Sequence, residues 1–347
     1  MCIPPYADVW ERHGIPLCPQ PLDEAAWQCV HEAFADGLFL CGKNAQESLS
    51  MARQVRQRVP GVPLFLGGGA TGDNVRELLQ EYEKRRHAQS GRPGSHTLFY
   101  GAGRSGRGRH MKIIAVPNYE TLSCCAADIV EAQIRQKPDT CLGTVTGSSP
   151  EGMYRELVRR HREEGLELSR IRAVNTDEYA GLSGTHPQSY RHYLEEHFFR
   201  PCGIPSEHTA VPQGDAADPE AECRRYEALC RSHPADLQIL GVGHTGHIGF
   251  NEPADDFPEL THLVDLAPQT LAANARYFDD PDTMPRQAIT VGLGVLMRAK
   301  RILLLLSGSG KAEITERLLC GRIVPQVPAT ILRLHPDVTA VIDEDAL

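Results

Sequence analysis

From residue 111 onward, short apolar runs alternate with stretches in which apolar residues recur every three or four positions. The short runs predict strands and the longer spacing predicts amphipathic helices. The predicted strands are Lys112–Val116, Thr140–Val145, Arg170–Asn175, Leu237–Val242, Gln287–Val291, Ile302–Leu306 and Val338–Ile342. The predicted helices are Tyr119–Arg135, Pro150–Glu163, Gln188–Phe199, Pro219–Ser232 and Ser309–Leu319. This alternation predicts an α/β fold with a parallel, doubly wound sheet and helices on both faces.

The first 85 residues carry a shorter version of the same pattern. The predicted strands are Ala35–Cys41 and Val62–Leu66, and the predicted helices are Glu47–Arg58 and Gly72–Glu83. They predict a partial βαβα fragment, whose open strand edges need cover. The Gly-rich loop 67–74 is interpreted either as a phosphate cradle or as a flexible turn. Residues 86–110 are basic and rich in Gly, Arg and Ser, which predicts a disordered linker more than an RNA contact.

The loop Leu240–Pro253 holds four glycines, two histidines and one glutamate directly after a predicted buried strand. Glycine is used where the backbone bends or approaches a ligand, and His and Glu transfer protons near neutral pH. The ends of parallel strands are where such a sheet binds its ligand. The loop therefore indicates an active site, with a tight turn bearing surface histidines as the alternative.

Three further strand ends carry candidate chemistry. Asp177 and Glu178 follow a strand and fit either a general base or a helix cap with a solvated acid. The small residues of Gly143–Pro150 precede a helix and offer N–H groups to an anion. Leu303–Lys311 is again a strand, a Gly/Ser turn and a lysine, which fits an anion site or a plain strand end with a solvated lysine.

Together these segments resemble the glucosamine-6-phosphate deaminase/isomerase family, in the superfamily that also holds 6-phosphogluconolactonase. The matching segments are Val145–Pro150, Asn175–Tyr179, His186–Tyr190, Gly241–Pro253, Ala273–Phe278 and Ser307–Lys311. The resemblance extends over residues 111–347, and the Phe-Asn-Glu-Pro continuation after Gly249 separates deaminases from lactonases. The resemblance implies a Rossmann-like, three-layer αβα domain. It also implies hydrolytic deamination and isomerisation of glucosamine 6-phosphate to fructose 6-phosphate and ammonia.

The resemblance assigns roles to residues of this chain. Asp177 is implied as the base that moves a proton between C2 and C1, and His247 as the ring-opening residue supported by Glu252. The implied phosphate contacts are Gly147, Ser148, Ser149, Arg276 and Lys311, and the other implied substrate contacts are Glu178, Gly243 and Gly246. We expect no metal and no organic cofactor.

Thr245 departs from many family members, which carry an acid two positions before the catalytic histidine. We count Thr245 with the catalytic residues, because its hydroxyl can still orient the ring. It cannot stabilise an imidazolium by charge, which leaves a catalytically weak sugar-phosphate sensor as an alternative. A deaminase for galactosamine 6-phosphate or a related amino-sugar phosphate is another alternative, and relatives differ in oligomeric state, so a homo-oligomer stays open.

The N-terminal residues 1–85 resemble the C-terminal βα units of the BtpA-like (β/α)8 barrel family over Pro16–Tyr82. The match covers only part of such a barrel, so a closed barrel is excluded and little function transfers. We interpret this part as a fusion remnant, joined by the linker 86–110 to the deaminase-like domain.

Composition changes this picture little. The chain has 347 residues, of which 41% are hydrophobic and 23% are charged, and a net charge of −9. These are ordinary globular values, and the negative charge disfavours nucleic acid as a partner. No apolar run is long enough to span a membrane, and the eleven cysteines are scattered. We expect a cytoplasmic enzyme with reduced thiols and a small amino-sugar phosphate as its partner.

Overall fold

The computed structural model describes residues 111–278, 280, 283–320 and 322–347, and the backbone of three strands among the first 110 residues. The chain divides into two compact units, Met1–Ala115 and Val116–Leu347. The division falls inside strand β4 (Lys112–Val116), one of the predicted strands.

In the first unit, β1 (Leu38–Cys41) and β2 (Leu64–Gly67) form a parallel pair, as two predicted strands joined by a helix would. Strand β3 (His96–Gly101) continues this pairing in parallel with β2 and pairs antiparallel with β4. β3 lies inside the segment predicted as a linker, where Thr, Leu, Phe and Tyr follow one another and favour a strand. The two helices predicted for this unit lie outside the described residues.

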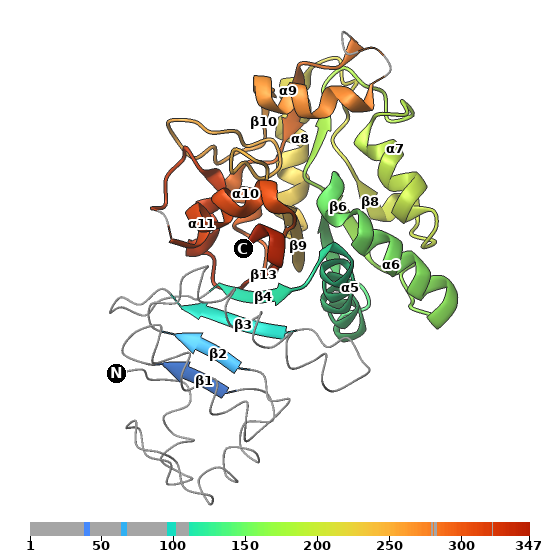
Figure 1. Cartoon of the computed structure of the whole chain (residues 1–347). Helices are drawn as coiled ribbons and strands as arrows, with labels where there is room; N and C mark the ends of the chain where they lie inside the picture. The colour runs from blue at the N-terminus through green and yellow to red at the C-terminus, as the bar shows by residue number, and fades with distance from the viewer. Residues whose placement is uncertain are drawn as a thin grey trace, which may run out of the picture. The chain divides into compact units, whose positions relative to one another are not determined.

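The second unit contains a parallel sheet whose described strands run in the order β13-β12-β9-β5-β6-β8 (Figure 1). The strands are β5 (Cys141–Thr144), β6 (Arg172–Asn175), β8 (Thr209–Ala210), β9 (Leu237–Gly241), β12 (Ile302–Leu306) and β13 (Val338–Asp343). From β5 the chain moves outward through β6 and β8, whereas β9, β12 and β13 extend the other way. The sheet is therefore doubly wound, as predicted, and its topological switch point lies between β5 and β9.

Helices cover both faces of this sheet. The helices are α5 (Tyr119–Gln136), α6 (Ser148–Glu164), α8 (Pro219–Ser232), α10 (Leu293–Leu296) and α11 (Ala312–Cys320). Helices α5 and α6 pack on each other and against β9, β12 and β13. Helices α8 and α10 pack together and, with β6 and β9, line a small cavity. Every residue of β12 is buried, which confirms the prediction of a strand covered on both faces.

A second, smaller sheet was not predicted. It is antiparallel, in the order β10-β11-β7, and consists of β7 (Asp177–Tyr179), β10 (His262–Asp265) and β11 (Gln287–Thr290). The strand predicted at Gln287–Val291 exists, but its place in the parallel sheet was wrong. Strand β7 starts at Asp177, two residues after β6 ends at Asn175. The apolar pattern of the sequence therefore predicts a single strand followed by a loop. The register places Asp177 opposite Thr290.

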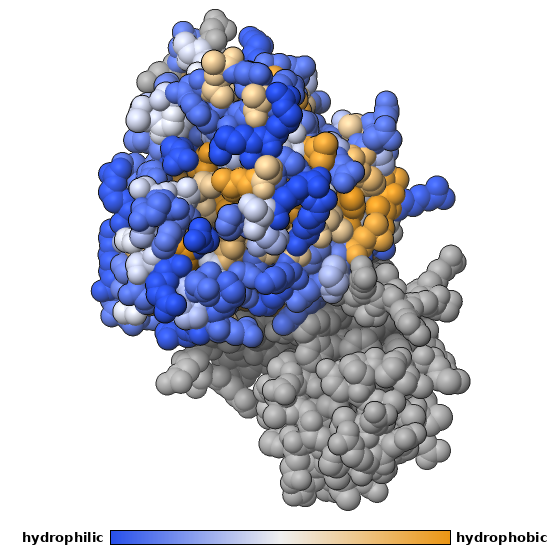
Figure 2. Space-filling view, turned by 180° about the vertical axis from the view of Figure 1, so that it is seen from behind, coloured by the Kyte–Doolittle hydropathy of each residue, from blue (hydrophilic) through white to orange (hydrophobic). Residues whose placement is uncertain are grey.

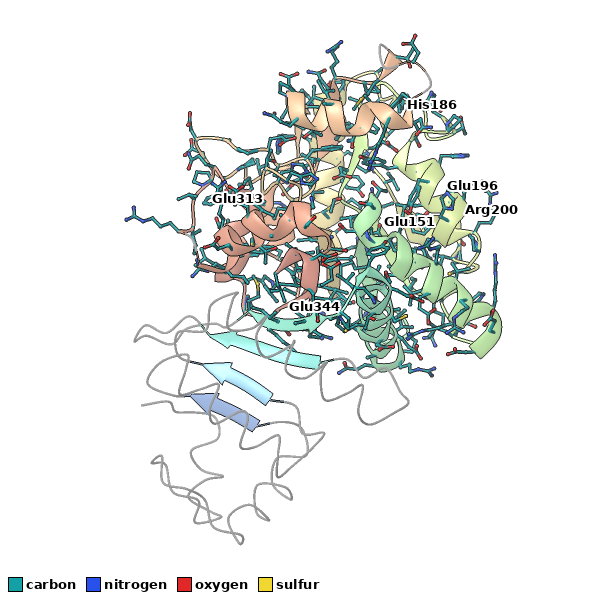
Figure 3. All side chains as sticks on the ribbon, in the orientation of Figure 1. Glu151, His186, Glu196, Arg200, Glu313 and Glu344 are labelled. Atoms are coloured by element: carbon teal, nitrogen blue, oxygen red, sulfur yellow. The ribbon has the colours of Figure 1, made fainter. Side chains whose placement is uncertain are left out.

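The predicted helix at Gln188–Phe199 is α7 (Tyr190–Leu194) followed by a π-helical turn, Glu195–Phe199. Glu196 of this turn is exposed and pairs with Arg200, which follows the turn, at 2.8 Å (Figure 3). Helix α9 (Pro268–Asn274) and the 3-10 turn Ala275–Tyr277 that follows it were not predicted. Gln269 and Ala272 are exposed, so α9 has no clear apolar stripe.

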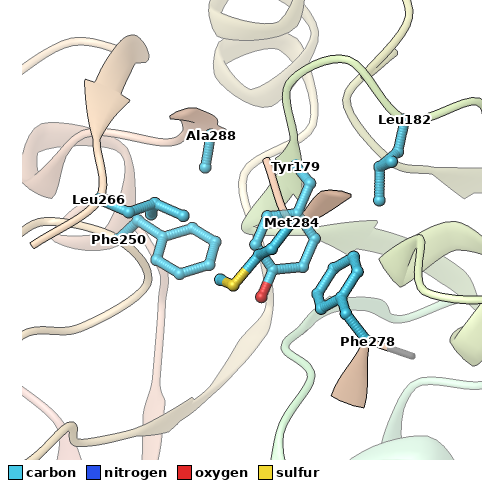
Figure 4. Packing of buried hydrophobic residues seen from close by; sticks show 7 residues of the cluster. All are labelled: Tyr179, Leu182, Phe250, Leu266, Phe278, Met284 and Ala288. Atoms are coloured by element: carbon cyan, nitrogen blue, oxygen red, sulfur yellow. The ribbon is translucent and has the colours of Figure 1, made fainter. Parts of the chain in front are cut away.

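Seven buried side chains join the small sheet to the loops around it (Figure 4). They are Tyr179, Leu182, Phe250, Leu266, Phe278, Met284 and Ala288. The Tyr179 ring lies 5.7 Å from the ring of Phe250 and 5.8 Å from that of Phe278. This cluster packs the strand that carries Asp177 against the loop that carries His247.

Seen from behind, the described surface is mainly hydrophilic with apolar patches (Figure 2). Over all the described residues, the exposed large hydrophobic side chains are those of Leu260, Ile323 and Leu334. Within the part of the chain that was searched, no helix has the length and apolar character of a membrane span.

Candidate active site

Two predicted loops meet at the switch point of the parallel sheet. Ser149 lies in the first turn of helix α6, just after the loop that follows β5, and Gly241 is the last residue of β9 before the loop that carries His247. A Cβ added to Gly241 would lie 3.1 Å from the Ser149 hydroxyl oxygen. The candidate phosphate loop and the histidine loop are therefore neighbours, where an α/β sheet of this topology binds its ligand.

The loop after β5 presents the start of helix α6. Gly147 precedes the helix with a φ of 99°, a conformation that side-chain-bearing residues rarely adopt, and Ser148 and Ser149 open its first turn. The N–H groups of a first helical turn have no partner within the helix, so they are free to bind an anion. The Tyr119 hydroxyl fixes this turn: it donates to the Ser148 carbonyl at 2.6 Å and accepts from Gly152 N–H at 2.8 Å.

Lys311 follows β12 in a turn that Asp343 holds. The Asp343 carboxylate accepts from the Ser307 hydroxyl, from Gly308 N–H at 3.0 Å and from Ala346 N–H at 3.0 Å. Burial lowers the pKa of Lys311 to about 8, and no described carboxylate lies within ion-pair distance of it. An anion beside this ammonium group would restore the favourable surroundings that burial removes.

Arg276 lies apart in the chain from these loops, on the turn Ala275–Tyr277 after α9, and its side chain is exposed. The loops after β5 and β12 leave from strands on either side of β9, so Ser148, Ser149 and Lys311 belong to one edge of the sheet.

His247 forms a cluster with Thr245 and Glu252. The His247 Nδ1 atom lies 2.9 Å from the Thr245 hydroxyl and 3.2 Å from Glu252 Oε2, and the Thr245 hydroxyl lies 3.4 Å from the same carboxylate oxygen. A carboxylate only accepts, so Thr245 donates to Glu252 and accepts from Nδ1–H. This assigns the proton to Nδ1 and leaves the lone pair of Nε2 available as a base.

Gly243 and Gly246 shape this loop. A Cβ on Gly243 would lie 2.1 Å from Nε2 of His247, so the imidazole occupies the space that any side chain here would need. Gly246 has a φ of 86° and faces Ile314 and Val327. Both glycines are thus required by the packing of the loop, and their contact with substrate stays a prediction.

Asp177 lies beside the histidine loop. A Cβ added to Gly249 would be 3.2 Å from Asp177 Oδ2 and 3.0 Å from the Thr290 hydroxyl. Burial raises the pKa of Asp177 to about 7, Thr176 opposes the rise and the neighbouring Glu178 adds to it. A carboxyl group that titrates near neutral pH can both take and return a proton.

Glu178 has a different environment from Asp177. Its carboxylate accepts N–H groups of Tyr179, Tyr190 and Arg191, each at 2.9 Å. It therefore holds the start of helix α7, the capping role considered for this acidic pair, and its contact with substrate remains a prediction.

The sequence analysis missed three residues that support the site. Tyr119 and Asp343 fix the anion loops, and Thr270 of α9 donates to Glu252 Oε1. Asp343 follows an apolar strand, as Asp177 follows one, and could have been found by the same rule. A single threonine in a weakly patterned helix gives no signal.

Comparison with known proteins agrees with this geometry. A family model described as glucosamine-6-phosphate isomerases/6-phosphogluconolactonase matches residues 120–341. The chain is 50% identical to the glucosamine-6-phosphate deaminase of Geobacillus sp. (strain WCH70) over 238 residues, which are 68% of this chain and 95% of that protein. It is 48% identical to glucosamine-6-phosphate deaminase 1 of Bacillus subtilis (strain 168) over 237 residues, or 68% of this chain and 98% of the relative.

Solved structures give the same result. A monomeric glucosamine-6-phosphate deaminase is 48% identical with a TM-score of 0.67, over 68% of this chain and 98% of that one. The 6-phosphogluconolactonase of Thermotoga maritima is 19% identical with a TM-score of 0.53, over 67% of this chain and 98% of that one, and shares the fold. The chain belongs to the family of glucosamine-6-phosphate isomerases and 6-phosphogluconolactonases, and these relatives at 48–50% identity are named as deaminases.

Proposed function

We propose that the chain converts glucosamine 6-phosphate and water to fructose 6-phosphate and ammonia. The observation that carries the proposal is the His247–Thr245–Glu252 cluster beside the buried carboxyl group of Asp177. The names of the relatives support the substrate.

Ring opening requires a proton to move from the O1 hydroxyl to the ring oxygen. His247 can perform both halves of this transfer, because Thr245 and Glu252 hold its Nδ1 proton and leave Nε2 to accept and return the other. A positioned acid or base of this kind typically contributes about 10² to 10⁴ in rate.

Deamination then requires a base at C2 of the open chain. Asp177 takes the C2 proton while a proton of the C2 ammonium group passes to O1, which gives an enolamine. Asp177 then returns its proton to C1, which leaves a protonated imine at C2. Water adds to C2 and ammonia leaves, so one water is consumed and one ammonia is released. Burial supports this role, because it raises the pKa of Asp177 to about 7, close to the working pH.

The phosphate group would be held by the N–H groups and hydroxyls of Gly147, Ser148 and Ser149, with Lys311 and Arg276 as cations. Charge-assisted hydrogen bonds to the phosphate would fix C1 and C2 against the two proton-transfer groups. The partly desolvated ammonium group of Lys311 supports this assignment.

The test is ammonia release from glucosamine 6-phosphate by the native chain, Asp177→Asn and Asp215→Asn. Asp215 is exposed and outside the site, so its variant controls for the charge change. We expect release that falls by at least about 10³ in Asp177→Asn and is kept in Asp215→Asn. Release from galactosamine 6-phosphate only would move the specificity to that sugar. No release from either sugar, with binding retained, would make the protein a sensor.

The N-terminal unit takes no part in this reaction under our proposal. The matched family region starts at residue 120, and relatives that lack the first unit are covered over 94–98% of their length by the rest. The likeness of residues 1–85 to BtpA-like barrels, the cytoplasmic location and the oligomeric state remain predictions from sequence.

A further inference from the structure

Helix α9 contacts both parts of the candidate active site. Near its start, Thr270 donates a hydrogen bond to Glu252 Oε1. At its end, the Asn274 amide donates to the Tyr179 hydroxyl at 3.0 Å. Glu252 belongs to the histidine loop, and Tyr179 follows Asp177 by two residues in β7. The chain then continues from α9 into the turn that carries Arg276.

Thr270 is placed differently from its neighbours in α9. It is 5% exposed, whereas Gln269 and Ala272 are exposed and Leu271 is half-buried. Its hydroxyl is therefore directed into the protein, where an unpaired polar group would be costly, and the Glu252 carboxylate is its acceptor. The hydrogen bond from Thr270 to Glu252 thus connects α9 to the loop that carries His247.

The Thr270 contact matters because the Glu252 carboxylate also contacts His247 and Thr245. Its Oε1 atom accepts from Thr270, and its Oε2 atom faces His247 Nδ1 at 3.2 Å and Thr245 at 3.4 Å. Thr245 carries no charge, so Glu252 is the carboxylate on which the His247 ring depends among the described residues. A rotation of this carboxylate would move the acceptor away from Nδ1.

We propose that Thr270 is a positioning residue that couples helix α9, and through it Arg276, to the His247–Glu252 pair. The inference rests on the proposed function. When Arg276 engages the substrate phosphate, the turn that carries it fixes α9, and α9 fixes the Glu252 carboxylate through Thr270. Phosphate binding at one end of the substrate thereby orients the ring-opening base at the other.

The electrostatics of Glu252 agree with this role. Burial alone raises the pKa of Glu252, but contacts from His247, Thr270 and Thr245 outweigh burial and hold its pKa below the ordinary value. Removal of the Thr270 hydroxyl takes away one of these contacts. The carboxyl group should then protonate at a higher pH.

The experiment compares the full chain with Thr270→Val, Thr270→Ser and Asn274→Ala. Valine keeps the shape and removes the donor, and serine keeps the donor. Asn274→Ala removes the hydrogen bond from α9 to Tyr179 without touching Glu252. We expect Thr270→Val to lower kcat about tenfold with KM changed less than about threefold. The acidic limb of its pH–rate profile should move up by about one pH unit.

The two control variants should give different results. Thr270→Ser should restore the native profile, and Asn274→Ala should change KM but leave the acidic limb in place. A native pH profile in Thr270→Val, or a loss that serine does not rescue, would overturn the inference.

A readout without turnover keeps this result apart from the proposed function. The side-chain carboxyl carbon of Glu252, assigned by comparison with Glu252→Gln, can be titrated by NMR in the folded chain. Its midpoint should rise by about one pH unit in Thr270→Val and stay native in Thr270→Ser. An unmoved midpoint contradicts the role of Thr270, whereas an inactive native chain contradicts only the proposed function.

Discussion

Asp177 illustrates how the candidate base is made by its surroundings. It is 4% exposed, and no described lysine or arginine forms an ion pair with it. Its ionised form is therefore disfavoured in the folded state, and its pKa rises from 3.8 to about 7. The same burial that suits it to proton transfer works against the stability of the fold when the group is charged.

This conflict predicts a pH dependence of stability. The folded-state pKa of Asp177 is raised, so folding retains its proton and stability falls as the pH rises from about 4 through about 7. Over that window the native chain should lose on the order of 4 kcal/mol more unfolding free energy than Asp177→Asn. Urea unfolding at pH 4 and pH 8 measures the difference. Equal pH slopes for the two chains would show that Asp177 is ionised at ordinary acid pH.

Thr245 gives a second prediction at this scale. An aspartate there would place a charge where the threonine hydroxyl lies 2.9 Å from His247 Nδ1. The added carboxylate should stabilise positive charge on the neighbouring ring, so the pH–rate profile should move toward higher pH. Measurement of kcat/KM against pH for the native chain and Thr245→Asp tests it. Identical profiles would mean that Glu252 alone sets the charge at the ring.

At the scale of elements, the sequence predicted the strands of the parallel sheet better than their partners. Buried runs such as Ile302–Leu306 identify themselves by composition, and the Gly-rich loops after them follow from the rules for such sheets. Periodicity carries no information on pairing, so β11 could not be assigned to the second sheet. Helix α9 was missed because its apolar face is narrow. The hydrogen bond from Thr270 to Glu252 was missed together with the helix that carries it.

The two hydrogen bonds between the Tyr119 hydroxyl and the first turn of helix α6 give a prediction at this scale. Tyr119→Phe removes the hydroxyl that holds Ser148 and Gly152, so the first turn of α6 should lose definition. We expect KM for the sugar phosphate to rise about three- to tenfold with little change in kcat. Tyr226→Phe is the control, because its hydroxyl binds carbonyls of Asn175 and Ala210 away from the phosphate loop. That variant should lower Tm and leave KM near its native value, and a rise in both variants would argue against a local brace.

At the scale of the whole molecule, the match to relatives separates two parts of the chain. The deaminase relatives align to about two thirds of it, and the family model matches residues 120–341, which include every predicted catalytic and phosphate-binding residue. A chain that starts at Met111 should therefore keep kcat/KM within about threefold of the full chain. Activity and circular dichroism on both chains test this. A shortened chain that folds but loses activity would assign the first unit a role in the site.

Asp177 stands where the chain passes from one sheet to another. Its strand pairs with β11 in the antiparallel sheet, while the phosphate loop belongs to the parallel one. A three-stranded sheet with one short strand opens more easily than a fully buried parallel core. Partial opening of the antiparallel sheet would therefore displace Asp177 and stop the reaction without global unfolding of the chain. Turnover should disappear at lower urea than the helix signal, and the amides of β7 should exchange with solvent before those of β12.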